Sequence, residues 1–466
     1  MTQSRERRHP QGKNDIVLIT IDSLQYDYIA SDSGLASDLP GHRELADGGA
    51  FFTNAFSNAS ITKASFLSIF SGTFPWMFES VPGGFGPDRP HVADLLSNAG
   101  YTTAGFNTNP YLSTTYRYDR GFDYFMGRDT DEDVDQTTIS AKYWPIIKEA
   151  LPSRRLSESV RSMYGTAGEK FGIQLGGDPY VPAEKVNEAV FQWLEGTSGP
   201  RFLWIHYMDV HTPYYPRDGT ISEDIDKRQA IKLFHKVNNL GNDAHPDDLA
   251  TLERLYHGEV KHLDQRILEL LEGLKSQLDL EETLIAYGSD HGEAFGTHDA
   301  VFHPDGVLYD ELTHVPLIVN GPGFDVGHVS TPVSNVDIVP TLLSLANADV
   351  PSVCVGEDLS NIVRNPPDER LVFAEAWDIE TGRVMVTSGK HKLIRDLETG
   401  VEWLYDRQEN PSEDRNLIDE LPQVRRELGT AISDHLELIR DHESDSEHVD
   451  VDDEVKTRLR MLGYDE

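Results

Sequence analysis

Acidic and imidazole side chains follow two apolar segments of this sequence, at the points where each segment ends. Asp290 and His291 come shortly after the apolar segment 284–287, and Asp22 ends the apolar segment 15–21. In an open α/β sheet, ligands bind in the crevice outside the carboxyl ends of the strands, so these side chains are candidate metal ligands. For the Asp-His pair alone, a hydrogen-bonded turn is the alternative interpretation.

A threonine stands at the expected start of a helix. Apolar residues at helical spacing predict a helix that begins near Lys63 and ends at Gly72, with Thr62 close to its N-cap. Threonine is a favoured capping residue, so a purely structural role is one interpretation. The other is a nucleophile, because a helix N-terminus presents N–H groups and a positive dipole end to a phosphate or sulfate.

Further polar side chains follow other expected strands. Asn109 lies in the loop after the strand expected at 101–106, where it is either a turn residue or a contact for an anion's oxygen. Two histidines and an aspartate lie within six residues where the strand expected at 202–207 ends: His206, Asp209 and His211. Packing and turn formation are the alternative roles for these three residues.

The elements that must position these side chains alternate between strands and helices, which is typical of an α/β fold. Buried strands are expected near 15–22, 50–56, 101–106, 202–207, 284–287 and 315–320, and helices near 41–47, 63–72, 92–99, 183–194, 252–274 and 339–346. After residue 370, short strands and a last helix at 421–440 predict an antiparallel sheet. We therefore expect a catalytic domain over 1–369 and an α+β subdomain with an acidic tail over 370–466.

Three polar segments are not assigned to this framework. The insertion at 127–180 either shapes a substrate entrance or is a solvated segment without function. The segment 217–247 is expected to be a surface excursion, and the acidic segment 441–454 a solvated surface.

The charge of the chain is strongly negative. Asp and Glu number 79 against 41 Lys and Arg, a formal net charge of -38. Such a charge repels nucleic acid and anionic membranes, and it suits a salt-rich cytoplasm, so a halophilic archaeon is the expected source. The single cysteine, Cys354, excludes an intrachain disulfide. No apolar segment has the length of a signal peptide or membrane span, which predicts a cytoplasmic protein without membrane contact.

Taken together, these motifs resemble the sulfatase family of the alkaline phosphatase superfamily over nearly the whole chain. The matching segments are Ile19-Thr-Ile-Asp22, 62–72, Asp209-Val-His211-Thr-Pro-Tyr214, Gly288-Ser-Asp290-His291-Gly-Glu293, Val315-Pro-Leu-Ile318, Asn335-Val-Asp337-Ile-Val-Pro-Thr341, Trp403-Leu-Tyr-Asp406, Asn410-Pro-Ser-Glu413 and 459–464. The resemblance implies an alkaline-phosphatase-like fold: a mixed, mostly parallel sheet flanked by helices, with a small C-terminal antiparallel sheet plus a helix.

By position, the resemblance also implies site residues. One divalent metal ion is expected on four residues: Asp22, Thr62, Asp290 and His291. Thr62 is in addition the expected nucleophile. The side chains expected to contact the anion or assist the leaving group are His211 and His303, and further substrate-binding candidates are Lys63, Asn109 and His298.

The sequence departs from the usual sulfatase pattern at two places. Sulfatases oxidise a Cys or Ser to formylglycine, but threonine stands at position 62, and Phe66 replaces the arginine that supports that group. Ser23 follows Asp22 where typical sulfatases have a second Asp ligand. The chain therefore looks closer to a threonine-nucleophile branch. His291 stands where calcium-binding sulfatases often carry Asn, which favours manganese or zinc over calcium or magnesium.

The expected function is a metal-dependent hydrolase of phosphate, phosphonate or sulfate esters with a Thr62 nucleophile. Phosphate and phosphonate esters come first, because a threonine ester needs a second attack by water, whereas a formylglycine sulfate can be expelled by elimination. One alternative is a true sulfatase without formylglycine, and another is a metal-binding member without catalysis. The expected partner is a small anionic ester, and a homo-oligomer is a further option.

Overall fold

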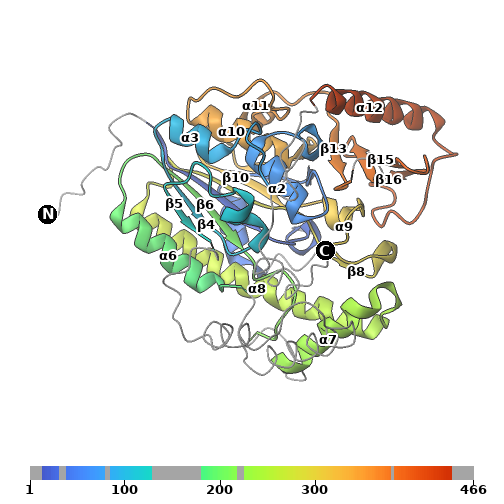
Figure 1. Ribbon diagram of the computed structural model, residues 1–466, viewed down its shortest axis with the longest axis horizontal. Coiled ribbons are helices and arrows are strands. Elements are labelled where there is room, and N and C mark those ends of the chain that lie inside the picture. Colours follow the sequence, from blue (N-terminus) through green and yellow to red (C-terminus); the bar gives the residue numbers. More distant parts are fainter. Residues whose placement is uncertain are drawn as a thin grey trace, which may run out of the picture.

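An eight-stranded sheet lies at the centre of the computed structural model, which describes residues 13–30, 38–78, 84–127, 180–217, 225–378 and 382–442 (Figure 1). The strand order is β11-β2-β10-β7-β1-β6-β4-β5. The strands, from one edge to the other, are β11 (Gly327–Val329), β2 (Ala50–Phe52), β10 (Leu317–Asn320), β7 (Leu284–Ser289), β1 (Ile16–Ile21), β6 (Arg201–Tyr207), β4 (Thr102–Phe106) and β5 (Tyr124–Met126).

The three middle strands are parallel and fully buried. β1 pairs with β6 on one side and with β7 on the other, so that Ile16 lies opposite both Phe202 and Leu284. Continuous apolar residues suit strands that are covered on both faces. β10 runs antiparallel to both β7 and β2, so the sheet is mixed and mostly parallel, as the resemblance predicted. Because β1 and β7 end side by side, the residues that follow them meet at one edge of the sheet.

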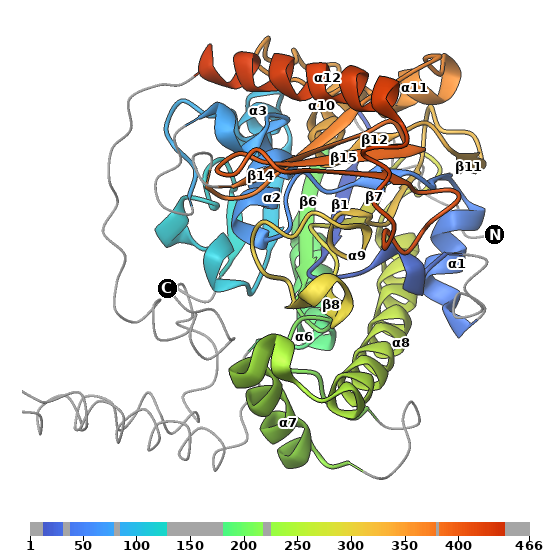
Figure 2. The same ribbon diagram turned by 90° about the vertical axis from the view of Figure 1, so that its right-hand side faces the viewer.

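Helices cover the two faces of the sheet, and alternate residues of β1 face opposite helical layers. Val17 and Ile19 pack with α1 (Pro40–Asp47), α6 (Ala183–Gly196) and the long α8 (Pro246–Gln277). Ile16 and Leu18 pack with the layer on the other face. That layer contains α2 (Thr62–Ser71), α3 (Val92–Asn98), α10 (Ile338–Leu345) and α11 (Leu359–Arg364) (Figure 2).

The C-terminal part forms a separate four-stranded antiparallel sheet with one helix packed on it, as expected. Its elements are β13 (Val372–Glu375), β14 (Arg383–Thr387), β15 (His391–Asp396), β16 (Glu402–Asp406) and α12 (Pro422–Arg440). Buried Lys392 joins this sheet to the short helix α9 (Asp310–Thr313) through Asp310 at 2.9 Å, and it also contacts Glu413 at 3.0 Å. The division of the chain at residue 370 stays a prediction.

Two expected segments differ in the structure. The strand expected at 50–56 divides: β2 stays in the large sheet, whereas β3 (Ala55–Phe56) pairs with β12 (Val333–Ser334). The polar segment 217–247, expected to be a surface excursion, contains the helix α7 (Lys227–Leu240), which the sequence did not predict. Three apolar residues, Ala230, Phe234 and Val237, are buried on one face of α7, and the many polar residues between them hid this pattern.

Two short antiparallel strands follow the end of β7. They are β8 (Ala294–Phe295) and β9 (Val301–Phe302), which pair with each other. The insertion expected at 127–180 and the acidic segment expected at 441–454 lie almost entirely outside the described residues. Within the described parts of the chain, we find no helix with the length and apolar character needed to cross a membrane.

The buried imidazole of His42 predicts a loss of stability in acid. His42 packs edge-on against Phe51 and beside Tyr287, and burial lowers its pKa to about 4. The unfolded chain has an ordinary His pKa of about 6.5, so below that pH the unfolded state binds a proton that the folded state does not. We expect this one group to lower the free energy of unfolding by about 2 kcal/mol between about pH 7 and about pH 5. Urea unfolding of the wild type and His42→Leu at both pH values measures this effect. An equal loss in both proteins would contradict it.

Candidate active site

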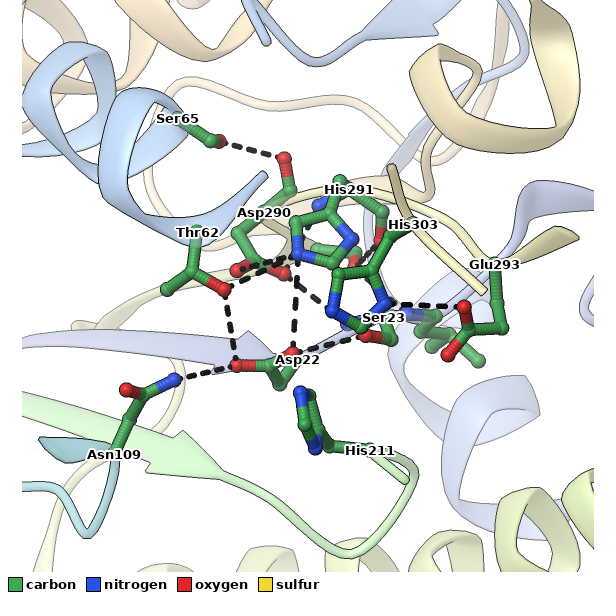
Figure 3. A network of polar contacts seen from close by, with 12 residues as sticks. Asp22, Ser23, Thr62, Ser65, Asn109, His211, Asp290, His291, Glu293 and His303 are labelled. Carbon is green, nitrogen blue, oxygen red and sulfur yellow. Dashed lines mark hydrogen bonds and ion pairs between the residues drawn. The ribbon is translucent and has the colours of Figure 1, made fainter. Parts of the chain in front are cut away.

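Two carboxylates and an imidazole meet at the ends of β1 and β7. Asp22, Asp290 and His291 are all fully buried, and each offers a ligand atom within 4.8 Å of the others. His291 Nε2 lies 3.6 Å from Asp290 Oδ2 and 3.9 Å from Asp22 Oδ1 (Figure 3). The structure therefore brings together three of the four residues expected to bind a metal.

Hydrogen bonds hold the ends of β1 and β7 together. Ser289 Oγ lies 2.7 Å from the carbonyl oxygens of both Ile21 and His291, and it accepts the Leu24 N–H at 3.0 Å. The backbone N–H groups of Ser23 and His291 both donate to Asp290 Oδ1, at 3.2 and 2.9 Å. The backbone itself thus fixes the direction in which Asp290 points.

The charge of the cluster suits a divalent cation. Asp290 Oδ2 is buried and has no hydrogen-bond partner among the described residues. Burial, together with the Asp22 carboxylate, raises the pKa of Asp290 well above its ordinary value. Burial also acts to raise the pKa of Asp22, but His211, His206 and His291 outweigh it and hold that pKa well below its usual range. Two buried carboxylates side by side are costly unless a cation joins them.

The tautomer of His291 also suits metal binding. Its Nδ1 lies 2.8 Å from the Gly292 carbonyl oxygen, which can only accept a hydrogen bond. Nδ1 therefore carries the proton, and the lone pair of Nε2 faces the carboxylates. Burial lowers the pKa of His291 to about 4, so the ring is neutral at physiological pH and can act as a ligand.

Thr62 reaches this cluster from the other side. It is the first residue of α2, whose N-cap is Ile61, and its side chain makes no capping hydrogen bond. Instead, Thr62 Oγ1 lies 3.1 Å from His291 Nε2 and 3.4 Å from Asp22 Oδ2. Ser65, one turn further on, anchors α2 by donating to the Asp290 carbonyl oxygen at 2.6 Å. The capping interpretation of Thr62 is therefore wrong, and its hydroxyl points into the cluster.

Two of the substrate-binding candidates lie beside Thr62 or Asp22. Asn109 Nδ2 donates to Asp22 Oδ2 at 2.8 Å, while its Oδ1 accepts the Tyr111 N–H at 2.9 Å. Lys63 follows Thr62 on α2, and its Nζ lies 4.2 Å from the centre of the Tyr111 ring. Asn109 thus contacts a candidate ligand directly, which its loop position alone did not reveal.

The ring of His303 lies next to those of both His291 and His211. The ring centres of His303 and His291 are 4.7 Å apart, and those of His303 and His211 are 5.1 Å apart. His211 Nδ1 lies 2.7 Å from the Thr212 carbonyl oxygen. Burial lowers the pKa of both His211 and His303 to about 4. Both candidates for assisting the leaving group are thus inside the site.

Sequence reasoning missed a buried carboxylate that supports His303. Glu293 Oε1 lies 3.0 Å from His303 Nδ1, and Glu293 Oε2 accepts the Tyr214 hydroxyl at 2.5 Å. Burial raises the pKa of Glu293 to about 7. Glu293 and Tyr214 both belong to the sequence motifs that resemble the family, but a Glu or a Tyr at such a position can equally be a turn or packing residue. The one signal in the sequence was that Tyr214 lies close to His211 and Glu293 close to His291.

His206 is a second residue to which the resemblance assigned no role in the site. It lies within β6, where its Nδ1 contacts Thr20 Oγ1 at 2.9 Å and its Nε2 lies 3.4 Å from Asp22 Oδ2. Phe66 packs edge-on against this ring, with centres 4.9 Å apart. Ser23 Oγ donates to Asp22 Oδ1 at 2.9 Å. Two of the residues that depart from the usual sulfatase pattern thus contact Asp22 or its neighbour: Ser23 contacts Asp22, and Phe66 contacts His206.

The remaining candidate, His298, is not part of the cluster. Its ring stacks on Tyr309 at 3.7 Å, its Nδ1 lies 2.6 Å from Glu311 Oε1, and its Nε2 lies 3.2 Å from the Glu413 carbonyl oxygen. These contacts use both ring nitrogens, one on Glu311 of α9 and the other on Glu413, which follows β16. The structure therefore does not support the expected substrate contact of His298.

A second acidic group does not require a metal. Glu184, Asp209 and His262 offer ligand atoms within 4.8 Å of one another. However, Arg266 Nη1 lies 3.2 Å from Glu184, and Arg217 Nη2 lies 3.8 Å from Asp209. Two guanidinium groups thus already balance these carboxylates.

Comparison with known proteins identifies the family. The model of the family described as Sulfatase matches residues 14–348, which is most of the chain. The chain belongs to the sulfatase family. A second model, described as N-sulphoglucosamine sulphohydrolase, C-terminal, matches residues 299–441. As a member of this family, the protein is a hydrolase that acts on ester bonds.

Two relatives match this chain over most of its length. The uncharacterized sulfatase YidJ of Escherichia coli (strain K12) is 29% identical over 461 residues, covering 92% of this chain and 88% of that protein. The choline-sulfatase of Rhizobium meliloti (strain 1021) is 23% identical over 444 residues, covering 88% and 83%.

Solved structures share the alkaline-phosphatase-like fold. The phosphonate monoester hydrolase SpPMH from Silicibacter pomeroyi has a TM-score of 0.67 at 19% identity, covering 93% of this chain and 96% of that chain. The 2-O GAG sulfatase BT1596 has a TM-score of 0.65 at 18% identity, covering 95% and 96%. The fold class predicted from the sequence is thus confirmed.

Removing one carboxylate of the cluster should weaken metal binding. We expect Asp290→Asn to lower the affinity for manganese or zinc by at least about tenfold, because the substitution removes a charged ligand. Calorimetric titration of the metal-free protein measures the affinity. Asp264→Asn is the matched control, since that largely buried carboxylate accepts the Gly41 and His42 N–H groups outside the cluster. Equal affinities of wild type and Asp290→Asn would show that the metal binds elsewhere.

Proposed function

We propose that this sulfatase-family protein is a metal-dependent hydrolase that cleaves phosphate or phosphonate esters with Thr62 as the nucleophile. One observation carries the proposal. Thr62 Oγ1 lies 3.1 Å from His291 Nε2 and 3.4 Å from Asp22 Oδ2, at the N-terminus of α2 and inside a buried cluster of candidate metal ligands. A hydroxyl in this position is where a nucleophile has to be, and threonine cannot become formylglycine.

The side chains present fit a divalent ion held by four residues: Asp22, Thr62, Asp290 and His291. The nitrogen ligand of His291 favours manganese or zinc, with calcium or magnesium as alternatives. When bound, such an ion neutralises the charge of the substrate and lowers the pKa of a nearby hydroxyl. These four side chains fit a divalent ion whether the substrate is a phosphorus ester or a sulfate ester.

Different residues of the chain carry out different steps of the proposed reaction. The N-terminus of α2 directs N–H groups and a positive dipole end toward an anion beside Thr62. The Thr62 hydroxyl gives its proton to solvent, its oxygen attacks phosphorus in line, the bond to the leaving oxygen breaks, and His211 or His303 protonates that oxygen. Such protonation contributes about 10²- to 10⁴-fold in rate. Water then attacks the Thr62 ester and gives one proton back to the histidine. As the bond from phosphorus to Thr62 breaks, Oγ1 takes up a proton from solvent and the hydroxyl is restored.

Sulfate esters are the alternative class of substrate for the same site. Relatives in the comparison include the choline-sulfatase of Rhizobium meliloti (strain 1021), and the structural neighbours include both a sulfatase and a phosphonate monoester hydrolase. We rank phosphorus esters first because a threonine ester must be hydrolysed by a second attack, without the elimination that formylglycine permits. A metal-binding member without catalysis is the remaining alternative.

Replacement of Thr62 tests the nucleophile and the substrate class together. We expect Thr62→Ala to lower kcat by at least about 10³-fold, whereas Thr62→Ser keeps a hydroxyl and retains activity. The measurement is turnover of matched aryl phosphate monoesters, phosphate diesters, phosphonates and sulfates by the metal-loaded protein in molar salt. Ser71→Ala is the matched control, because its hydroxyl contacts the Leu67 carbonyl oxygen at the other end of α2.

The pattern of turnover distinguishes the three candidate functions and tests the role of Thr62. Turnover of phosphorus esters that is lost in Thr62→Ala supports the proposal. Cleavage of sulfates alone favours the sulfatase alternative. Absence of turnover with every ester favours the metal-binding member without catalysis, and turnover that survives in Thr62→Ala would exclude Thr62 as the nucleophile.

The net charge of -38 further supports adaptation to high salt. The Debye length falls from about 10 Å at 0.1 M to about 3 Å at 1 M salt, which screens the repulsion between surface carboxylates. We expect the Tm to rise when KCl is raised from about 0.1 M to about 2 M. Thermal unfolding in KCl, beside an uncharged osmolyte as control, measures the effect. A Tm that rises equally with the osmolyte would point to preferential exclusion in place of charge screening.

A further inference from the structure

We infer that Lys392 and Arg407 of the C-terminal part are positioning residues for the proposed metal site, and that they act through the short helix α9. The inference rests on the proposed function, because it concerns the ion that the candidate ligands would share. It depends on two sets of contacts. Backbone hydrogen bonds join α9 to the segments that carry those ligands, and ion pairs join α9 to the C-terminal part.

The backbone of α9 holds the segment that follows His291. The Gly292 N–H donates to the Leu312 carbonyl oxygen at 2.9 Å, and the Glu293 N–H donates to the Glu311 carbonyl oxygen at 3.0 Å. The two backbones approach closely, because a Cβ atom added at Gly292 would lie 2.0 Å from the Glu311 carbonyl oxygen. A shift of α9 would therefore move the backbone next to a candidate metal ligand.

The next two carbonyl groups hold the segments that carry Thr62 and Asp22. One donor lies shortly before Thr62 in the sequence, and the other lies shortly after Asp22. They are Ser57, whose N–H donates to the Thr313 carbonyl oxygen at 2.8 Å, and Tyr26, whose N–H donates to the His314 carbonyl oxygen at 3.3 Å. The consecutive carbonyl groups of residues 311–314 thus bind three segments that are far apart in the chain. A binding site keeps its geometry only when its side chains are held within about 0.5 Å, so the position of α9 affects the whole ligand set.

Two buried cations of the C-terminal part hold the start of α9. Lys392 Nζ lies 2.9 Å from Asp310 Oδ1, and Arg407 Nε lies 2.6 Å from Asp310 Oδ2. The Asp310 N–H donates to Glu413 Oε2 at 2.7 Å, and Lys392 Nζ contacts Glu413 Oε1 at 3.0 Å. Figure 1 shows α9 next to the C-terminal sheet. Two cations and two carboxylates thus balance one another, and removal of one partner leaves a buried charge without compensation.

The position of α9 depends on these tertiary contacts. The helix has four residues, and helices shorter than about 12–15 residues are marginally stable in isolation. Its C-terminal side continues into β10 of the large sheet, whereas its N-terminal side is held by the ion pairs at Asp310. We therefore expect the loss of one cation to displace α9 and, with it, the three segments that are hydrogen-bonded to residues 311–314.

Removal of one cation from the full chain tests the inference. We expect Lys392→Met to lower the affinity for manganese or zinc about three- to tenfold, because groups behind the ligands of a metal also set its affinity. Calorimetric titration measures the affinity. The visible absorption of the cobalt(II)-loaded protein measures the ligand geometry, and we expect its bands to shift in Lys392→Met. Arg407→Gln is the second variant, for which we expect the same direction of change, and it keeps the test possible if Lys392→Met does not fold.

A buried ion pair at the other end of the parallel strands provides the matched control. Arg201 Nη2 lies 2.8 Å from Asp15 Oδ2, and Arg201 Nε lies 3.1 Å from Asp15 Oδ1. These residues lie at the starts of β6 and β1, whereas the candidate ligands follow the ends of β1 and β7. We expect Arg201→Met to lower the Tm but to leave the metal affinity and the cobalt spectrum unchanged. Equal changes in Arg201→Met and Lys392→Met would show only a general loss of stability and would overturn the inference.

A double variant tests the route through α9. If Lys392 acts through Asp310, Lys392→Met causes no further loss of metal affinity once Asp310→Asn is present. Losses that add would assign Lys392 to another route and overturn the inference. Unchanged affinity and an unchanged cobalt spectrum in the folded single variants would also overturn it.

The proposed function and this inference fail in different ways. A wild type that binds no metal would remove both together. A wild type that binds metal but turns over no ester would remove the proposed reaction alone, because the affinity and the cobalt spectrum are measured without turnover. Turnover that depends on Thr62, with no change of affinity or spectrum in Lys392→Met and Arg407→Gln, removes the inference alone.

Discussion

Two carboxylates buried side by side are the constraint on which the rest of the site depends. Asp22 and Asp290 follow adjacent parallel strands, so the sheet itself forces them together, and neither is exposed to water. Their repulsion in a medium of low dielectric is relieved by a bound cation or by a retained proton. The neighbouring groups suit the first solution, since Asp290 Oδ1 is held by backbone N–H groups while Oδ2 has no partner within the described chain.

Hydrogen bonds on the outer side of the rings decide what each histidine of the site can do. Backbone carbonyl groups hold Nδ1 of His291 and His211, which leaves neutral rings with a lone pair on Nε2. A carboxylate, that of Glu293, holds Nδ1 of His303. The acceptor behind each ring thus differs, although burial lowers the pKa of all three imidazoles to about 4.

Much of the fold was predictable because burial leaves a regular pattern in the sequence. The apolar segments of β1, β6 and β7 are buried on both faces, and the spacing of leucines along α8 matches its buried side. The pattern failed where polar residues dominate a helix, as in α7, and where a short apolar segment belongs to two sheets, as at 50–56. In both cases long-range packing overrides the local signal.

The sequence by itself determined the residues that follow each buried strand, and therefore the candidates Asp22, Asp290 and His291, because strand ends of a parallel sheet share one edge. It also determined Thr62, which stands at the start of a helix. Only the tertiary structure decided which further side chains join them. Glu293 and Tyr214 come from different loops and meet through side-chain hydrogen bonds, whereas His298, close to His303 in the sequence, turns toward Tyr309. Side-chain direction depends on contacts between residues far apart in the chain, and no local pattern records those contacts.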